Sequence, residues 1–219
     1  VMLGGILFNI LSSVLIYTAI TFTRGDVYLS KEEVNKHGIL PNEIGISIGF
    51  REGDKIININ GRDFEKFTDV LHPYTLLTTD SYYTVLRAGQ IIRIDIPADL
   101  MKRLSDAKEQ ENFVTPRMPF AVGYVQRKSA AAHAGLQPGD QIIEVAEKPT
   151  IYFHQLKKTL EKNAGKKVPI CYIRAGITQN TSAIVSETGK LGLQPEILLT
   201  HEKKNYSIGQ AIPLGTLKT

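Results

Sequence analysis

The strongest constraint on the fold is a segment that occurs twice in the chain. Residues 49–60, GFREGDKIININ, align with residues 135–146, GLQPGDQIIEVA. A second match joins residues 87–89 to residues 174–176, both of which read Arg-Ala-Gly. The members of the first pair are 86 residues apart and those of the second pair 87. Because two matches at nearly one offset indicate a duplication, the sequence predicts two copies of one domain of about 80 to 90 residues.

Each copy has the pattern of one amphipathic helix on a small, mostly antiparallel sheet. A Gly-Asp turn precedes a strand-like run of β-branched residues at 55–59 and at 141–145, and a hairpin follows around each Arg-Ala-Gly. Between these strands lie apolar residues at helical spacing, namely Phe64, Phe67, Val70 and Leu71 in the first copy and Phe153, Leu156 and Leu160 in the second. The predicted fold class is therefore α+β, mainly β with helices.

The first 23 residues contain no charged side chain, since every Lys, Arg, Asp and Glu follows Thr23. A helix of this length rises about 34 Å, whereas the hydrocarbon core of a bilayer is about 30 Å thick. No basic segment precedes the run and no small-residue cleavage pattern ends it, which argues against a signal peptide. A buried helix of a soluble protein is the alternative. The sequence predicts a transmembrane helix over residues 1–23.

The charge and motif content exclude several classes of function. The 219-residue chain has a net charge of +4, and its 26 Lys and Arg are scattered among 22 Asp and Glu, so we expect no nucleic-acid partner. Cys171 is the only cysteine, which excludes an intrachain disulfide. None of the five histidines lies in a His-Glu-x-x-His pattern, and no Gly-x-Ser-x-Gly motif occurs. We therefore predict no metal ligand and no catalytic residue in this segment.

The second copy resembles bacterial PDZ domains. Residues 128–143, KSAAAHAGLQPGDQII, are similar to the Ser-Pro-Ala-Ala-x-x-Ala-Gly-Leu-x-x-Gly-Asp-x-Ile segment of that family. The first copy keeps a shorter match at residues 48–56. The resemblance implies two tandem PDZ-like domains, the first over residues 27–111, including a charged connector, and the second over residues 112–199.

Two PDZ-like domains directly after a hydrophobic helix resemble the RseP-like site-2 protease family. These intramembrane zinc metalloproteases carry tandem PDZ domains between their second and third membrane helices. Gly5 and Asn9 are similar to the Gly-x-x-x-Asn segment of the family's second helix, although Ile6 stands where the family usually has Pro. Asn9 has either a functional role or an interhelical packing role.

This second resemblance implies several further properties. The PDZ domains would be circularly permuted, and zinc would be a cofactor of the full-length protein, held by ligands outside this segment. The full-length protein would be a multi-pass protein of the bacterial inner membrane, with the PDZ domains on the extracytoplasmic, periplasmic side. Residues 200–219 would form a tail that leads towards a further membrane segment.

The resemblance also implies a peptide-binding site. A PDZ domain binds an extended peptide as an added strand beside its helix, and a backbone loop receives the terminal carboxylate. In permuted domains that loop comes at the end of each copy. The expected site residues in the second copy are Lys190, Leu191, Gly192 and Leu193 in the loop, with His154 and Lys158 at the rim of the groove.

The first copy departs from this pattern. Its corresponding stretch is residues 112–116, in which Phe113 replaces the loop glycine. A glycine allows backbone N–H groups to approach an anion closely, whereas phenylalanine does not offer that freedom. We therefore expect carboxylate binding in the second copy.

The expected function follows from the family. The whole protein would cleave the membrane segment of a membrane-anchored protein substrate, such as an anti-sigma factor. The PDZ region would act as a steric gate against bulky substrates or would recognise an exposed C-terminus, and both roles stay open. The partners are then the substrate and the lipid bilayer. The alternatives are a non-enzymatic, membrane-tethered PDZ adaptor and an HtrA-type serine protease, whose protease domain would precede the PDZ pair.

Overall fold

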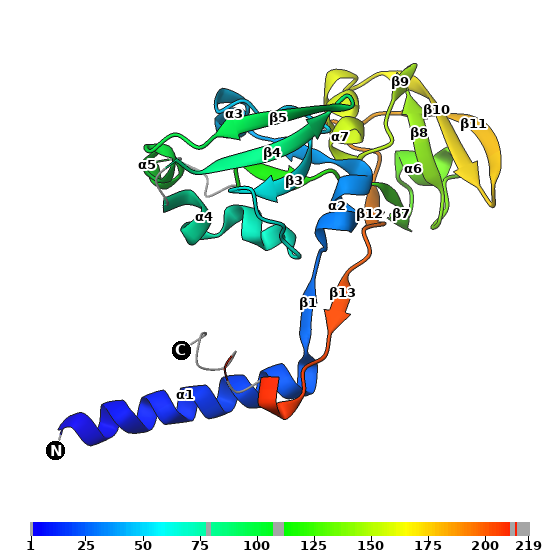
Figure 1. Ribbon diagram of the computed structural model, residues 1–219. Helices are drawn as coiled ribbons and strands as arrows, with labels where there is room; N and C mark the ends of the chain where they lie inside the picture. The colour runs from blue at the N-terminus through cyan, green and yellow to red at the C-terminus, as the bar shows by residue number, and fades with distance from the viewer. Residues whose placement is uncertain (1, 78–79, 107–111, 211–212, 214–219) are drawn as a thin grey trace.

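The computed structural model describes residues 2–77, 80–106, 112–210 and 213. An N-terminal helix leads into a two-stranded stalk, and the stalk carries two α+β modules (Figure 1). We name residues 29–116 the first module and residues 117–199 the second module. The fold class is α+β, as the sequence predicts.

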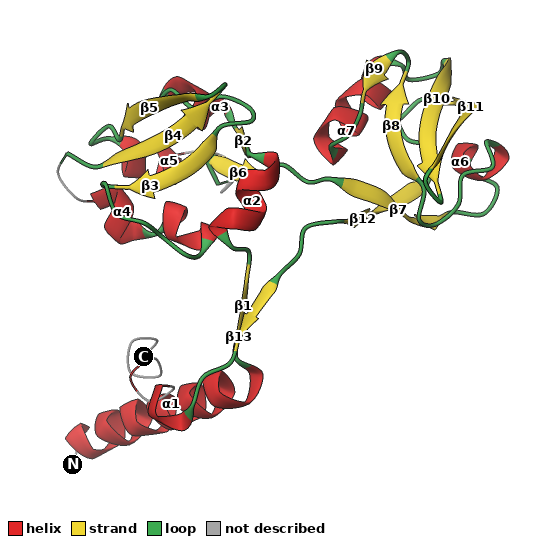
Figure 2. Cartoon of the chain, turned by 45° about the vertical axis from the view of Figure 1, so that its right-hand side comes forward, coloured by secondary structure: helices red, strands yellow, loops and turns green. Residues whose placement is uncertain are grey.

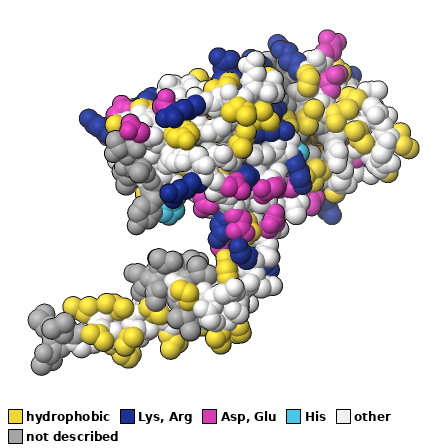
Figure 3. Space-filling view, viewed as in Figure 1, with side chains coloured by type: hydrophobic (Ala, Val, Ile, Leu, Met, Phe, Trp, Pro, Cys, Tyr) yellow, Lys and Arg dark blue, Asp and Glu magenta, His cyan; other side chains and the backbone are white. Residues whose placement is uncertain are grey.

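The N-terminal helix α1 (Met2–Arg24) contains the predicted transmembrane segment. Within Gly4–Arg24 an 18-residue window has a mean hydropathy of 1.8, and the helix is long and apolar enough to cross a membrane. Its apolar side chains are exposed rather than packed on the modules, as the space-filling view shows (Figure 3). Asn9 is exposed as well, and a Cβ on Gly5 would meet no atom within 4 Å.

The first module contains two small sheets and several short helices. A three-stranded antiparallel sheet has the order β3-β4-β5, and β2 pairs with β6. Its elements are α2 (Lys31–His37), β2 (Ile39–Pro41), α3 (Glu43–Ser47), β3 (Lys55–Ile59), η1 (Phe67–Leu71), α4 (Pro73–Leu77), β4 (Tyr82–Arg87), β5 (Gln90–Asp95), α5 (Leu100–Asp106) and β6 (Val114–Pro116).

The helical stripe predicted in the first module is only partly helical, because Phe64 lies before the helix that contains Phe67, Val70 and Leu71. Phe67 and Val70 are buried, as the stripe requires, but they lie on the 3₁₀ helix η1. His72 has an extended backbone (φ −71°, ψ 136°), which is the conformation expected of a residue that precedes a proline. Pro73 then begins α4. The proline therefore separates η1 from α4, beyond the last residue of the predicted stripe.

The second module has a four-stranded sheet with the order β11-β10-β8-β9 and a pair formed by β12 and β7. Helix α7 lies on one side of this sheet and α6 near its other edge (Figure 2). The elements are β7 (Phe120–Val125), α6 (Ala130–His133), β8 (Gln141–Val145), β9 (Lys148–Pro149), α7 (Phe153–Lys162), β10 (Lys167–Arg174), β11 (Ile177–Ile184) and β12 (Leu193–Ile197).

Each module has its own hydrophobic core. Phe113 and Val114 are buried in the first core, and β6 pairs with β2 of the first module. The chain therefore passes from the first module to the second after Pro116. Part of the predicted charged connector is helix α5, whose Leu100 is fully buried in the first core.

The stalk joins the two ends of the module pair. Strand β1 (Asp26–Tyr28) pairs antiparallel with β13 (Glu202–Lys204), so the chain enters and leaves the modules at one place (Figure 1). Beyond β13 the structure describes residues to 210 and residue 213, and the rest of the predicted tail lies outside the described residues.

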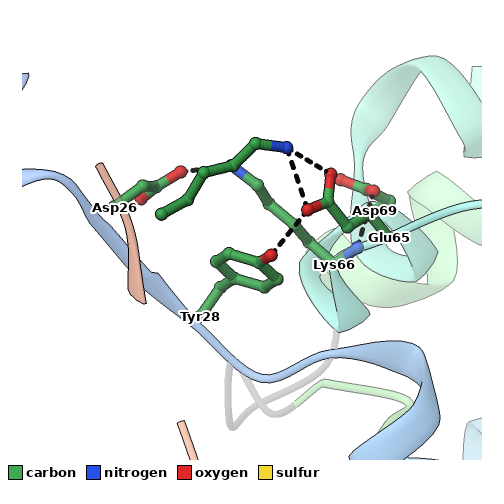
Figure 4. Close-up of polar contacts among 6 residues, drawn as sticks. Asp26, Tyr28, Glu65, Lys66 and Asp69 are labelled. Carbon is green, nitrogen blue, oxygen red and sulfur yellow. Dashed lines mark hydrogen bonds and ion pairs between the residues drawn. The ribbon is translucent and has the colours of Figure 1, made fainter. Parts of the chain in front are cut away.

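A polar cluster ties the stalk to the first module (Figure 4). The Tyr28 hydroxyl donates to Glu65 Oε1 at 2.6 Å, and Lys204 Nζ bonds both oxygens of Glu65 at 2.9 and 2.8 Å. Lys66 pairs with Asp26 and lies 5.2 Å from the centre of the Tyr28 ring. The hydrogen bond from Lys204 lowers the pKa of Glu65, and the bond to Glu65 raises the pKa of Tyr28. The cluster therefore links both strands of the stalk to one carboxylate.

Candidate functional site: a groove in the second module

A groove of about 790 Å³ lies between α7 and the loop that leads into β12. Tyr124 and Gln126 line it from β7 and the residue just after it. Helix α7 contributes Phe153, Leu156, Lys157, Leu160 and Glu161, the loop contributes residues 188–192, and β12 contributes Leu193 and Gln194. The groove thus lies between a helix and a strand of the same module.

One wall of the groove is the apolar face of α7. Its lining residues follow the spacing i, i+3, i+4, i+7 and i+8, which places them on one face of a helix. Leu156 and Leu160 are buried against the second core, and Phe153 packs on it from the edge. The rings of Phe153 and Phe120 meet edge to face at 5.7 Å. An occupant of the groove would therefore contact an apolar surface.

The loop that lines the groove has two adjacent backbone N–H groups, those of Leu191 and Gly192. The Leu191 carbonyl accepts the Ala131 N–H at 2.8 Å, and the Gly192 carbonyl accepts the Gln126 N–H at 2.9 Å. Among the described residues, no acceptor takes the N–H of Leu191 or of Gly192. Adjacent N–H groups without an internal partner are a suitable site for an anion.

Gly192 is required by its backbone conformation and by its surroundings. Its φ is +76°, in the region that favours glycine. A Cβ at this position would lie 2.4 Å from Cβ of Ser129. Ser129 caps α6, since its Oγ accepts the Ala132 N–H at 3.1 Å. The close approach to Ser129 therefore fixes the loop on the start of α6.

The corresponding position of the first module is filled by a core side chain. The Phe113 carbonyl accepts the Asn42 N–H at 3.0 Å, in the way that the Gly192 carbonyl accepts the Gln126 N–H. The Phe113 side chain, however, is 1% exposed. Its ring centre lies 6.0 Å from that of Phe50 and 6.3 Å from that of Tyr83. The first module thus uses this position for its core.

Four of the six residues expected to bind peptide line the groove, namely Lys190, Leu191, Gly192 and Leu193. His154 and Lys158 do not line it. Helix α7 places His154 towards the first module, where its Nε2 lies 3.1 Å from Glu52 Oε1. Lys158 is exposed.

Sequence reasoning missed the residues of α7 that line the groove. The signal was present, because Phe153, Leu156 and Leu160 form the apolar stripe predicted for this helix. The stripe predicts a helix packed on the sheet, whereas in the structure one face of this helix serves both the core and the groove. Lys157 and Glu161 flank that face. With Lys190, they give the groove two basic residues and one acidic residue.

The described residues do not fit a zinc site. Across residues 2–77, 80–106, 112–210 and 213, no three His, Cys, Asp or Glu side chains lie close enough together to hold a metal ion. Gly5 and Asn9 lie on α1, outside both modules.

Comparison with known proteins identifies the second module. The family model for the PDZ domain matches residues 122–174, from β7 to the end of β10. Among solved structures, the PDZ domain of an SdrC-like protein from Listeria monocytogenes is 17% identical and covers 37% of this chain and 90% of its own, with a TM-score of 0.33. A serine endoprotease from Yersinia pestis is 19% identical and covers 48% of this chain and 42% of its own, with a TM-score of 0.28. The chain contains a PDZ domain.

Two curated relatives extend the similarity beyond this domain. A protein of Neisseria meningitidis named "Putative zinc metalloprotease" is 28% identical over 71% of this chain, and one of the same description from Treponema pallidum is 26% identical over 59%. The chain spans 38% and 28% of the lengths of these relatives. The predicted resemblance to the RseP-like site-2 protease family is confirmed.

Proposed function

We propose that this chain is the tandem PDZ region of a membrane-bound zinc metalloprotease of the RseP-like type, and that its second module binds the C-terminal end of a protein substrate. The observation that carries the binding proposal is the pair of N–H groups at Leu191 and Gly192, two residues that line an apolar groove. A carboxylate at these groups would place the last residues of a peptide over α7.

Strand addition is the binding mode that fits the groove. Within the part of the chain that the structure describes, strand β12 has one partner, β7, in its sheet, which leaves its other edge for a further strand. A peptide on that edge would alternate its side chains, so every second one would face Leu156 and Leu160. Lys190 and Lys157 would add positive charge near the carboxylate.

The protease part of the proposal has separate support. Both curated relatives are named as zinc metalloproteases, and helix α1 is long and apolar enough to anchor the modules in a membrane. Zinc and the catalytic residues would then belong to other parts of a longer protein. The modules would lie on the periplasmic side of a bacterial inner membrane and would receive a membrane-anchored substrate whose C-terminus is exposed.

The test is a comparison of two peptides on the full chain in detergent micelles. One fluorescent peptide ends in an apolar residue with a free carboxylate, and the other has the same sequence with a C-terminal amide. Because a charged hydrogen bond contributes more than a neutral one, we expect the amide to bind at least about tenfold more weakly. Equal binding of the two peptides would overturn carboxylate recognition.

A matched pair of variants locates the site. Lys157 lines the groove, and the adjacent Lys158 does not. Lys157→Glu should weaken binding of the free-acid peptide clearly more than Lys158→Glu, although both change the net charge equally. Equal effects would indicate long-range attraction by net charge instead of binding in the groove.

A further inference from the structure

The first module contacts the start of the groove helix. Oε1 of Glu52, from the turn before β3, lies 3.1 Å from Nε2 of His154 and 3.4 Å from Nε2 of Gln155. Both partners belong to the first turn of α7. A carboxylate near the first turn of a helix also interacts favourably with the helix dipole. The first module thus holds the N-terminal end of one wall of the groove.

Arg117 strengthens this contact. Its guanidinium lies 3.7 Å from the centre of the Tyr152 ring, and Nη2 lies 3.4 Å from Oε1 of Glu52. The backbone N–H of Arg117 donates to the Gly38 carbonyl at 3.0 Å, and Nη1 donates to the His37 carbonyl at 3.3 Å. Arg117 therefore connects the first module to the residue that precedes α7.

The first module also holds the chain that follows β12, the strand on the other side of the groove from α7. After β12, the backbone N–H of Thr200 donates to Oε1 of Glu33 at 3.1 Å. Glu33 is 7% exposed, and its other carboxylate oxygen pairs with Lys36. Glu33 lies on α2, so α2 fixes the exit of β12 towards the stalk.

We propose that the first module is a brace across the peptide groove, in which Glu52 holds α7 and Glu33 holds the chain at Thr200, after β12 ends. The proposal rests on the peptide binding proposed above. In it, Glu52 and Glu33 are positioning residues that touch no peptide. We call the contact of Glu52 with α7 and the contact of Glu33 with Thr200 the two arms of the brace. The brace fixes the width of the groove only while both arms are intact. Loss of either arm should therefore have nearly the effect of losing both.

The test is a double-mutant cycle on the full chain in detergent micelles, with Glu52→Ala, Glu33→Ala and the double variant. The probe is the fluorescent peptide with the free carboxylate. Each single variant should weaken binding by about threefold to tenfold, because a less ordered groove is less often competent to bind. The double variant should bind at most about twofold more weakly than the weaker single variant. Effects that multiply, or no effect at all, would overturn the brace.

A control variant and a fold check keep the cycle interpretable. Glu144→Ala removes an exposed carboxylate of β8 that belongs to neither arm, and it should leave the affinity unchanged. The circular dichroism spectrum of each variant should match that of the unmodified chain. A loss of affinity in Glu144→Ala equal to that in Glu52→Ala would assign the effect to net charge and overturn the brace.

A second measurement needs no peptide. Spin labels at Lys158→Cys on α7 and Glu196→Cys on β12, with Cys171→Ala to remove the native thiol, report the distance across the groove. Glu52→Ala and Glu33→Ala should each broaden the distance distribution, and Glu144→Ala should not. If the unmodified chain binds no peptide but the distribution broadens, the brace stands and the proposed peptide binding fails. If the chain binds peptide and the distribution stays unchanged, the brace is wrong.

Discussion

Arg174 donates two parallel hydrogen bonds to Asp140, from Nε to Oδ1 and from Nη2 to Oδ2, each 2.7 Å long. Arg87 and Asp54 form the same pair in the first module, again with two bonds of 2.7 Å. In each module Nη2 also donates to the carbonyl of the first glycine of the repeated segment, at 2.8 and 2.7 Å. The two sequence matches that mark the duplication are therefore the two halves of one interaction.

The Arg87 pair should be important for the stability of the first module. The Asp54 side chain is fully buried, so Arg87→Ala would leave an uncompensated charge and lower the free energy of unfolding by about 3 kcal/mol. Arg87→Lys should recover only part of this loss, because an ammonium group cannot make the two parallel bonds. Urea denaturation of the full chain in detergent measures both changes.

The control for this prediction is an exposed pair in the same sheet. Arg93 and Asp95 bond at 2.6 Å, but both side chains are more than half exposed. Arg93→Ala should therefore have a much smaller effect on unfolding than Arg87→Ala. Equal effects of the two variants would contradict the special role of the buried pair.

Gly192 and Gly176 provide a matched pair of left-handed glycines. Both have positive φ, +76° and +78°, but a Cβ on Gly176 meets nothing within 4 Å. Gly176→Ala should cost about 1 kcal/mol from backbone strain alone. Gly192→Ala should cost about 1 to 3 kcal/mol more, because its Cβ would collide with Ser129. Urea denaturation measures the difference, and equal destabilisation of the two variants would contradict the predicted collision.

The sequence predicted the duplicated α+β fold because its strongest patterns are local. A Gly-Asp turn, a β-branched strand and a hairpin each depend on neighbouring residues, and Asp140 does bond the nearby Gln137 N–H at 2.7 Å. The predicted loop, Lys190 to Leu193, was also local, since it rests on one glycine and its neighbours. The helix of the first module is predicted less well, because its stripe includes Phe64, which lies before the short 3₁₀ helix η1.

The rest of the site depends on contacts between distant residues. His154 has the spacing of a rim residue, but its partner, Glu52, is 102 residues away in the chain. No periodicity of α7 could reveal that partner. The same is true of Glu33 and Thr200, which are 167 residues apart. The contact of His154 with Glu52 thus determines which side of α7 faces the first module.

The cluster at the stalk gives a further prediction. Tyr28→Phe removes the hydroxyl that donates to Glu65, which should loosen the pairing of β1 with β13. Hydrogen exchange of the amides in these two strands should become faster, and exchange in the two cores should stay unchanged. Tyr172→Phe is the control, because it removes a hydroxyl bond of 2.9 Å to Gln179 far from the stalk. Faster exchange in the stalk of that control would contradict the prediction.

Lowering the pH should weaken the hydrogen bond that Glu33 accepts from the Thr200 N–H. The hydrogen bond from Lys36 lowers the pKa of Glu33 most, followed by that from the Thr200 N–H. A carboxyl whose folded pKa lies below its unfolded value, about 4.3, stabilises the fold fully above that value. This contribution is lost as the pH falls through the folded pKa. The stability difference between the unmodified chain and Glu33→Ala should therefore be constant from about pH 6 to pH 7 and shrink below about pH 4.

Urea denaturation at several pH values measures this difference, and comparison of the two proteins cancels the titration of groups that they share. Lys36→Ala gives the internal check. Without Lys36 the folded pKa of Glu33 rises towards its unfolded value, because the largest cause of its depression is gone. The pH dependence attributable to Glu33 should then become smaller, since the two pKa values lie closer together. A difference that grows on acidification would mean that Glu33 is protonated in the folded chain, and the link to Thr200 would then not involve a carboxylate.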